Sequence, residues 1–177
     1  MKFLQDFCVR FGSLRSLSEA FYLTFLGIVL GSTLVLGAIV APVVFKAALF
    51  MDLPAADLLA SGRLMSEIFR RFSYILAFAS LLIAAYEIWS FFADGREQTA
   101  QTGLEIAIKS AAAIAVISSA AFAFYYTPEV LRMQELGAEA IDSARFSAIH
   151  RQAESVFKIL SASLFALLFA RLVAIKF

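Results

Sequence analysis

The stretch that decides the fold is AFYLTFLGIVLGSTLVLGAIVAPVVF, residues 20–45, which contains no charged side chain. It is longer than the roughly 20 residues that a helix needs to cross about 30 Å of hydrocarbon. The whole chain is 62% hydrophobic and only 16% charged, with a mean hydropathy of +0.84. In soluble domains about half of the residues are hydrophobic and about a quarter are charged. The chain is therefore expected to fold inside a membrane.

Three further stretches are apolar enough to span. Residues 72–93 are interrupted only by Glu87, and residues 104–126 become uncharged after Lys109. The fourth span, residues 156–176, is the weakest, because Lys158 and Arg171 must extend toward the lipid headgroups. The pattern predicts an all-α integral membrane protein, a four-helix bundle within one domain of residues 1–177. With four spans, both termini lie on the same side of the membrane.

Amphipathic segments outside the spans predict further helices. Residues 3–16 have apolar residues at helical spacing and predict an interfacial helix, either an anchor or a partner-binding element. Residues 54–71 continue the spacing of the second span, and residues 128–150 begin with Thr127-Pro128-Glu129, a typical helix start. Together the two extensions are expected to form a helical cap on one side of the bundle.

Signals for location and assembly are less specific. The first residues lack the pattern of a cleaved signal peptide, so the first span is expected to act as the insertion signal. We expect a multi-pass protein of the bacterial inner membrane, whose orientation stays open because Lys and Arg divide almost equally between the two sides. Small residues at four-residue spacing, such as Gly27 and Gly31, favour close helix packing within the bundle or in a homo-oligomer.

Three charged residues fall within the spans at one predicted depth. Glu87, Lys109 and Arg171 each lie about five or six residues from the span end on the side of the termini. A carboxylate there would offset the desolvation of one of the cations, and such a cluster could act as a gate or an ion site. The alternative is that Lys109 and Arg171 only extend toward headgroups, with Glu105 pairing with Lys109 one turn away.

A polar line accompanies this cluster. Ser66, Ser73 and Ser80 precede Glu87 at seven-residue intervals, on one face of the second helix. Serines in membrane helices usually bond to their own backbone or to a neighbouring helix, which is the structural interpretation. The functional interpretation is that the line borders a pathway ending at Glu87.

The sequence lacks the motifs that are typical of several classes of function. The chain has no phosphate-binding glycine loop and no nucleophile elbow, so no catalytic residue is assigned and no enzyme is expected. His150 is the only histidine, which is too few for a typical zinc or copper ligand set, and no metal or other cofactor is predicted. A net charge of +1 without basic clusters argues against nucleic acid, leaving the lipid bilayer as the expected partner.

Short motifs at the capped side resemble a known family. They comprise Pro42 at the end of the first span, Gly62 and Phe69-Arg70 before the second, and Phe146 with His150 before the fourth. In this order they are similar to the transmembrane-protein-205-like proteins (domain of unknown function 4149), which look related to the copper-resistance D-type membrane proteins. The resemblance implies a four-span bundle whose shared residues gather at the capped side. It brings no established reaction, although family members are linked by analogy to metal or metallodrug resistance.

Three functional interpretations follow. The first is a small transporter or permeation protein for an ion or small solute, using the serine line and the charged cluster. The alternative is a structural or assembly protein that uses the cap as a docking surface and has no transport activity. The second alternative is a haem- or metal-binding membrane protein, by analogy with the copper-resistance proteins.

Overall fold

Four long helical rods make up the fold. The computed structural model describes residues 2–46, 58–94 and 103–174, and in these ranges the chain forms helices and turns without any strand. The first rod is α1 (Lys2–Val35), continued by a short π-helix, η1 (Leu36–Val40), and by α2 (Ala41–Phe45). The second rod is α4 (Leu58–Asp94), one uninterrupted helix.

The third and fourth rods meet at a compact turn. The third consists of α5 (Gly103–Ala121), a second π-helix η3 (Phe122–Tyr126) and α6 (Thr127–Glu135). A single turn of helix, α7 (Ala138–Ile141), leads into the fourth rod, α8 (Ala144–Ala174). Each of the four rods contains a stretch long and apolar enough to cross a membrane.

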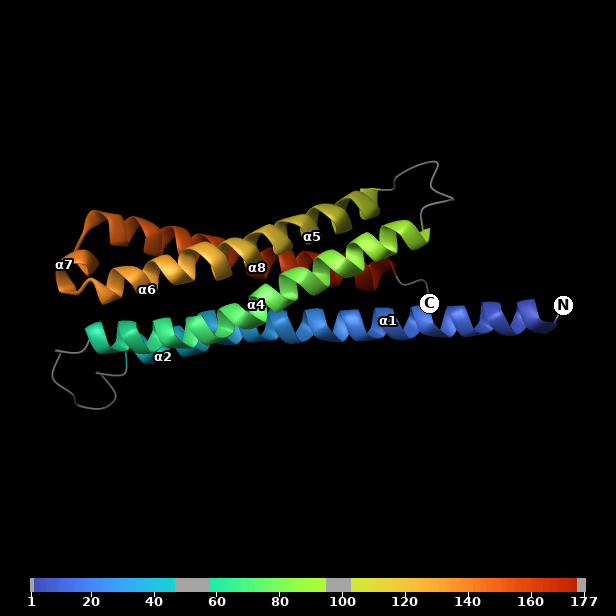
Figure 1. Ribbon diagram of the computed structural model, residues 1–177, viewed down its shortest axis with the longest axis horizontal. Coiled ribbons are helices and arrows are strands. Elements are labelled where there is room, and N and C mark those ends of the chain that lie inside the picture. Colours follow the sequence, from blue (N-terminus) through green and yellow to red (C-terminus); the bar gives the residue numbers. More distant parts are fainter. Residues whose placement is uncertain (1, 47–57, 95–102, 175–177) are drawn as a thin grey trace.

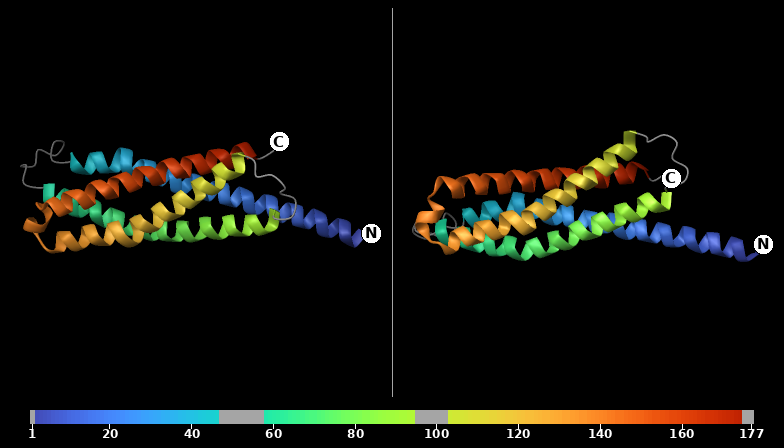
Figure 2. Two further views of the ribbon diagram at one scale, coloured as in Figure 1. Left: turned by 90° about the horizontal axis from the view of Figure 1, so that it is seen from above. Right: turned by 45° about the horizontal axis from the view of Figure 1, so that its top comes forward.

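The rods run antiparallel to their neighbours along the chain (Figure 1). α1 packs against α8 and α4, and α5 lies between α4 and α8. Both termini lie at one end of the bundle, which we call the terminal end, as four spans require. The other end holds α2, α7 and the starts of α4 and α8, and we call it the capped end. The first turns of α1 extend past the other helices at the terminal end (Figure 2).

The interior is apolar, and so is the outer surface. Fully buried side chains from three rods form the centre of the core: Tyr22, Leu26, Leu76, Ile83, Leu160, Leu164 and Leu167. Large apolar side chains such as Leu81, Ile117 and Phe165 are mostly exposed on the outside. An apolar exterior around a closed helical bundle suits lipid, where every backbone group must be satisfied within its own helix. The protein is therefore a multi-pass membrane protein.

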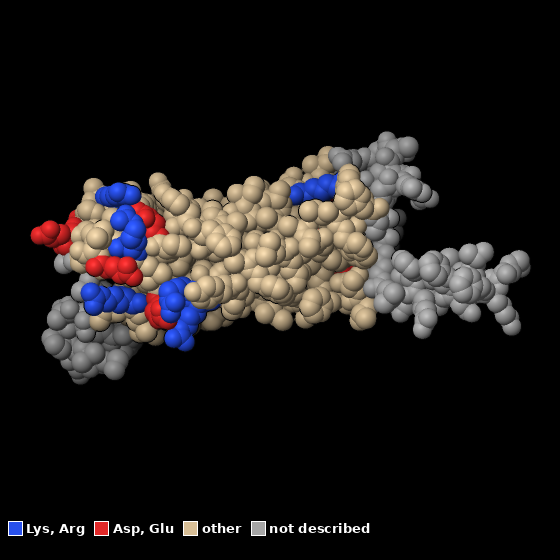
Figure 3. All heavy atoms as spheres, in the orientation of Figure 1, with Lys and Arg blue, Asp and Glu red and all other residues tan. Residues whose placement is uncertain are grey.

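Charged side chains mark the two edges of the apolar surface. Figure 3 shows Lys, Arg, Asp and Glu gathered at the capped end, with an uncharged belt beside them. Three rods repeat one spacing, because each has charged residues 20 positions apart, which is about 30 Å at 1.5 Å per residue. These pairs are Glu67 and Glu87, Lys109 and Glu129, and Arg151 and Arg171. The spacing is close to the thickness of the hydrocarbon layer. The exposed Arg70, Arg71, Glu154 and Lys158 also lie between the paired levels, so the uncharged belt is shorter than this spacing.

Each of the two prolines that the structure describes follows a π-helix. Pro42 comes two residues after η1 and Pro128 two residues after η3. A proline inside a helix lacks an N–H and its ring collides with the carbonyl four residues earlier. The wider π-turn lies at that carbonyl and lets the rod continue past the proline.

Three predicted boundaries differ from the structure. The prediction of one helix over residues 128–150 is wrong: the chain breaks at Gly137, whose φ of 95° ends α6 in the left-handed conformation that glycine favours. Thr127 continues the third rod in helical conformation and makes no capping hydrogen bond. Residues 3–16 are the first part of α1 and not a separate helix, and residues 54–57 of the predicted second extension lie outside the described residues.

Candidate functional site

Glu87 forms the centre of a polar cluster near the terminal end. The Tyr22 hydroxyl donates to Glu87 Oε1 at 2.8 Å, and Arg171 donates from Nη2 to Oε2 at 2.5 Å and from Nε to Oε1 at 3.3 Å. The same Nη2 reaches Ser90 Oγ at 3.5 Å. Both carboxylate oxygens of Glu87 are therefore occupied by donors from two other helices.

Two aromatic rings cover the charged pair. Tyr22 and Tyr86 stack with ring centroids 3.8 Å apart and an interplanar angle of 14°. The Arg171 guanidinium lies 5.4 Å from the Tyr86 ring centroid and 5.9 Å from that of Tyr22. Cation–π contacts of this kind stabilise a cation that has lost part of its water. We call Tyr22, Tyr86, Glu87, Ser90 and Arg171 the Glu87 site.

Three rods supply these residues. α1 contributes Tyr22, α8 contributes Arg171, and α4 contributes the rest. Tyr86 and Ser90 are four residues apart and lie one turn from each other, so α4 presents them with Glu87 over little more than one turn. The site thus connects the helix nearest the N-terminus with the helix nearest the C-terminus.

Burial makes the pairing energetically important. The Glu87 and Arg171 side chains are only 15% and 12% exposed. Removing one partner of a buried ion pair leaves the other charge uncompensated, which typically costs about 3–5 kcal/mol. The pair therefore ties α4 to α8 through two buried opposite charges near the terminal end.

Lys109 is not part of this hydrogen-bonded group. In the described part of the chain its ammonium nitrogen is buried without a hydrogen-bond partner, and it lies 5.1 Å from the centroid of the Phe91 ring. No ion pair joins Lys109 to Glu87 among these residues. Of the three charged residues predicted to meet, the structure brings together Glu87 and Arg171.

The predicted serine line faces the bundle interior. Ser66, Ser73 and Ser80 are all buried. Ser73 and Ser80 donate to the carbonyl oxygens of Arg70 and Ala77 on their own helix, at 2.7 and 2.8 Å. Ser66 Oγ accepts a hydrogen bond from Gln134 Nε2 at 2.8 Å, which ties α4 to α6.

Other hydroxyls share this interior. Thr33, Ser118, Ser119 and Ser163 are buried on the other three rods. Thr33 and Ser163 donate to carbonyls of their own helices. The Ser119 hydroxyl is fully buried and has no hydrogen-bond partner among the described residues, which is uncommon for a buried polar group.

Four phenylalanines close the interior toward the capped end, and we call them the phenylalanine group: Phe69, Phe72, Phe122 and Phe157. Phe157 packs edge-on against Phe69 and Phe72, with ring centroids 5.5 and 6.4 Å away, and against Phe122 of η3 at 5.1 Å. From the other side, η1 brings Gly37 so close that a Cβ atom there would lie 3.3 Å from Phe157 Cε1. Both π-turns thus lie against the same ring.

The six capped-side family positions occupy different surroundings. Phe69 belongs to the phenylalanine group, Gly62 offers its carbonyl to Gln134 at 3.4 Å, and Pro42 is exposed on α2. Arg70 forms a bidentate pair with Glu67, with contacts of 2.6 and 2.8 Å.

Phe146 and His150 form a separate pair. Their rings stack at 5.9 Å with an interplanar angle of 10°, and His150 is exposed. In the described part of the chain, no hydrogen bond or ring contact joins His150 to the remaining four positions. The six positions therefore share one end of the bundle and do not form a single binding site.

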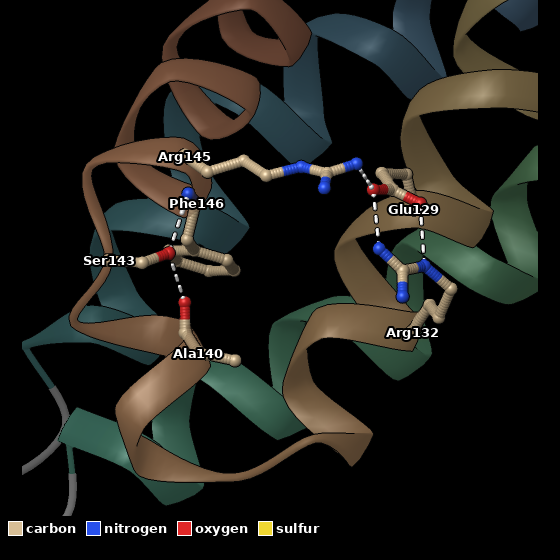
Figure 4. A network of polar contacts seen from close by, with 6 residues as sticks. All are labelled: Glu129, Arg132, Ala140, Ser143, Arg145 and Phe146. Atoms are coloured by element: carbon tan, nitrogen blue, oxygen red, sulfur yellow. Dashed lines mark hydrogen bonds and ion pairs between the residues drawn. The ribbon is translucent and has the colours of Figure 1, made fainter.

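A second polar network fixes the turn at the capped end (Figure 4). Glu129 accepts two hydrogen bonds from Arg132, both at 2.8 Å, and one from Arg145 at 3.0 Å. Ser143 Oγ accepts the Phe146 N–H at 3.1 Å. These bonds join α6 to the start of α8 across the break at Gly137, so the network stabilises the turn between the third and fourth rods.

Sequence reasoning missed three members of the Glu87 site. Tyr22, Tyr86 and Ser90 stand in apolar or mixed stretches, where nothing distinguishes them from lipid-facing or core residues. A usable signal existed for Tyr86, because it directly precedes the one acidic residue of its span. Tyr22 is separated from Glu87 by 65 positions, and its role depends on how α1 is rotated against α4.

Metal-binding groups are absent from the parts of the chain that the structure describes. No three residues among His, Cys, Asp and Glu come together there in a way that could hold an ion. The exposed His150 stacks on Phe146 and has Glu154 one turn away, but Glu154 binds Lys158 and no third ligand residue joins them in the described ranges.

Comparisons with known proteins give a family. A family model described as "Domain of unknown function (DUF4149)" matches residues 24–139. The match includes Glu87 and Lys109 and ends before Arg171. No curated protein and no solved structure matches the chain.

Proposed function

Because the chain belongs to the DUF4149 family, whose function is unknown, we propose from the Glu87 site that it is a small transporter or permeation protein for an ion or small solute. The observation that carries the proposal is the Glu87–Arg171 pair, two opposite charges held between helices at the edge of the hydrocarbon layer. Ionisable residues inside membrane bundles are expensive, and they commonly mark ion or substrate pathways. The proposal assigns no chemical reaction to the protein.

The interior hydroxyls support the same proposal. Ser66, Ser73 and Ser80 lead from the capped end toward Glu87 on the inner face of α4, and Ser119 adds an unpaired hydroxyl from α5. A permeating ion or solute that leaves water needs such polar groups along its path. Opening of the phenylalanine group around Phe157 would connect this line to the capped end.

The test is transport by purified protein in liposomes. We expect wild-type protein to give a flux of protons, potassium or chloride, each measured separately, above that of empty vesicles. Glu87→Gln should lower this flux by about tenfold or more, since the variant removes the charge that Arg171 and the permeant share. Glu154→Gln, which neutralises an exposed carboxylate paired with Lys158, is the matched control and should leave the flux unchanged. Wild-type flux no greater than that of empty vesicles would remove the proposal.

A structural or assembly role is the second candidate. The Glu87 site is saturated with hydrogen bonds, as expected of a lock between helices, and Gly27 and Gly31 have open space where a Cβ would lie. Small residues on an open helix face allow a second helix to approach closely, in a homo-oligomer or with another protein. Cross-linking in native membranes should then recover one dominant partner, and the absence of any cross-linked product would count against this role.

We also propose an evolutionary relation to proteins outside the matched family. The residues quoted above support a relation to the transmembrane-protein-205-like and copper-resistance D-type proteins. We also propose a place in the bacterial inner membrane. A haem- or metal-binding role gains no support from the described residues, because they bring no ligand group together. An absorption spectrum and metal analysis of protein purified from membranes would test this role directly.

A further inference from the structure

A groove lies between the third and fourth rods at the capped end. Its volume is about 340 Å³, within the range of small-ligand sites. Tyr126 of η3 contributes one wall, and α8 contributes the rest. The residues that line it are Tyr126, Ala148, Arg151, Gln152, Ser155 and Val156.

Arg151 is the charged residue of this groove, and its positive charge is not compensated. The neighbouring cations are paired: Arg132 and Arg145 bind Glu129, and Lys158 binds Glu154. Arg151 is exposed and has no ion-pair partner in the ranges that the structure describes. The groove therefore presents an unshared guanidinium beside the Gln152 amide and the Tyr126 hydroxyl, a set of donors that suits a phosphate group.

The level of the groove identifies the source of that phosphate. Arg151 lies seven residues, about 10 Å, before the exposed Lys158, after which α8 is uncharged up to Arg171, and therefore on the headgroup side of the hydrocarbon boundary. Tyr126 is an aromatic residue at the same boundary, as is common at membrane interfaces. On the hydrocarbon side, the apolar Val156 lines the groove, and Ile159 is exposed one turn further on.

We propose that this groove binds the headgroup phosphate of an anionic phospholipid. The Arg151 guanidinium binds the phosphate oxygens, and Gln152 and Tyr126 offer further hydrogen bonds to the headgroup. The Ser155 hydroxyl donates to the Arg151 carbonyl oxygen at 2.9 Å and lines the groove without a free hydrogen. The acyl chains then follow the apolar side of α8 past Val156 and Ile159. The site is independent of the transport proposal, because it lies on the outer surface at the other boundary from the Glu87 site.

The experiment measures lipid binding to the purified protein by native mass spectrometry. Detergent-solubilised wild type is titrated with phosphatidylglycerol and, separately, with phosphatidylcholine. We expect phosphatidylglycerol to bind about fivefold more tightly, as one basic residue near a membrane surface typically provides. Arg151→Gln should remove this preference, and 0.5 M salt should weaken it in wild type.

The matched control is Arg63→Gln. Arg63 is an exposed arginine at the same end, without an ion-pair partner among the described residues and outside the groove, so its variant should keep the preference. Equal binding of the two lipids to wild type, or an unchanged preference in Arg151→Gln, would overturn the proposal. Inorganic phosphate at millimolar concentration should not displace the lipid. If it does so in wild type and not in Arg151→Gln, the groove is a site for soluble phosphate esters and the headgroup assignment is wrong.

Discussion

Arg171 and Glu87 show how single residues make charge tolerable inside this bundle. Each side chain is more than four-fifths buried, and each satisfies the other through two hydrogen bonds. Tyr22 adds a third donor to the carboxylate, and two tyrosine rings cover the guanidinium. Neither charge would be stable alone in this position, because the desolvation of an unpaired ion is not repaid.

We predict that Arg171→Met lowers the free energy of unfolding by about 3 kcal/mol, since it leaves the Glu87 carboxylate buried with only the Tyr22 hydroxyl. The double variant Glu87→Gln/Arg171→Met should regain a large part of this loss. Denaturation in mixed micelles measures both values. Lys158→Met breaks an exposed pair and should cost less than about 1 kcal/mol. If the losses in free energy of unfolding of Glu87→Gln and Arg171→Met, each measured alone, simply add in the double variant, the two residues are not coupled.

At this scale the sequence predicted the depth of Glu87 and Arg171 but not their full environment. Because a helix rises 1.5 Å per residue, counting residues is enough to compare depths, and the pairing of Glu87 with Arg171 could therefore be predicted as one possibility. The direction in which a side chain points around its helix axis, relative to the neighbouring helices, cannot be predicted by counting residues. Lys109 shared the predicted depth, yet it lies against Phe91.

At the level of the helices, the third rod shows how a membrane helix continues through a proline. Sequence analysis interpreted Thr127-Pro128-Glu129 as a helix start, because this order is typical of one in water. The structure instead continues the rod through η3, since a break near lipid would leave carbonyl groups without partners. The true break comes at Gly137, inside the predicted helix of residues 128–150, because residue spacing alone does not reveal a positive φ.

The contact of η1 with Phe157 leads to a prediction about Gly37. A side chain at Gly37 must displace a ring that Phe69, Phe72 and Phe122 already surround, whereas Gly31 faces open space. Gly37→Val should therefore be less stable than Gly31→Val by about 1–3 kcal/mol, the usual cost of overpacking. Both variants make the same Gly-to-Val change within the first rod, so their difference in denaturation reports mainly the contact with Phe157, together with the change from α-helix to π-helix. Equal stabilities would mean that Phe157 moves aside freely.

The whole molecule was the most predictable level. Hydropathy and charge fixed four spans, their antiparallel order and the common side of the termini, because an apolar rod has few other ways to meet lipid. The neighbour relations were not predictable, since α5 could have packed against α1 as well as against α8 on composition alone. Packing of α1 mainly on α8 and α4 depends on side-chain shape along entire helices.

Topology is tested by cysteine labelling of the whole protein in sealed vesicles. In a Cys8→Ser background, we expect Ser16→Cys and Ala174→Cys to react with an impermeant maleimide from the same face. Ser147→Cys, at the capped end, should react from the opposite face. Permeabilised vesicles serve as the control, in which all three sites should react. Labelling of Ser16→Cys and Ala174→Cys from opposite faces would contradict the four-span arrangement.

The unequal uncharged runs of three rods also limit which bilayers suit the protein. A helix bundle usually adjusts to a thicker or thinner membrane by tilting individual helices. The uncharged runs are residues 72–86 in α4, 110–128 in the third rod and 159–170 in α8, so a thicker bilayer would first bury the charged residues that flank the run in α8. Lipid chain length is therefore a physical variable for the stability of the protein alongside temperature and salt.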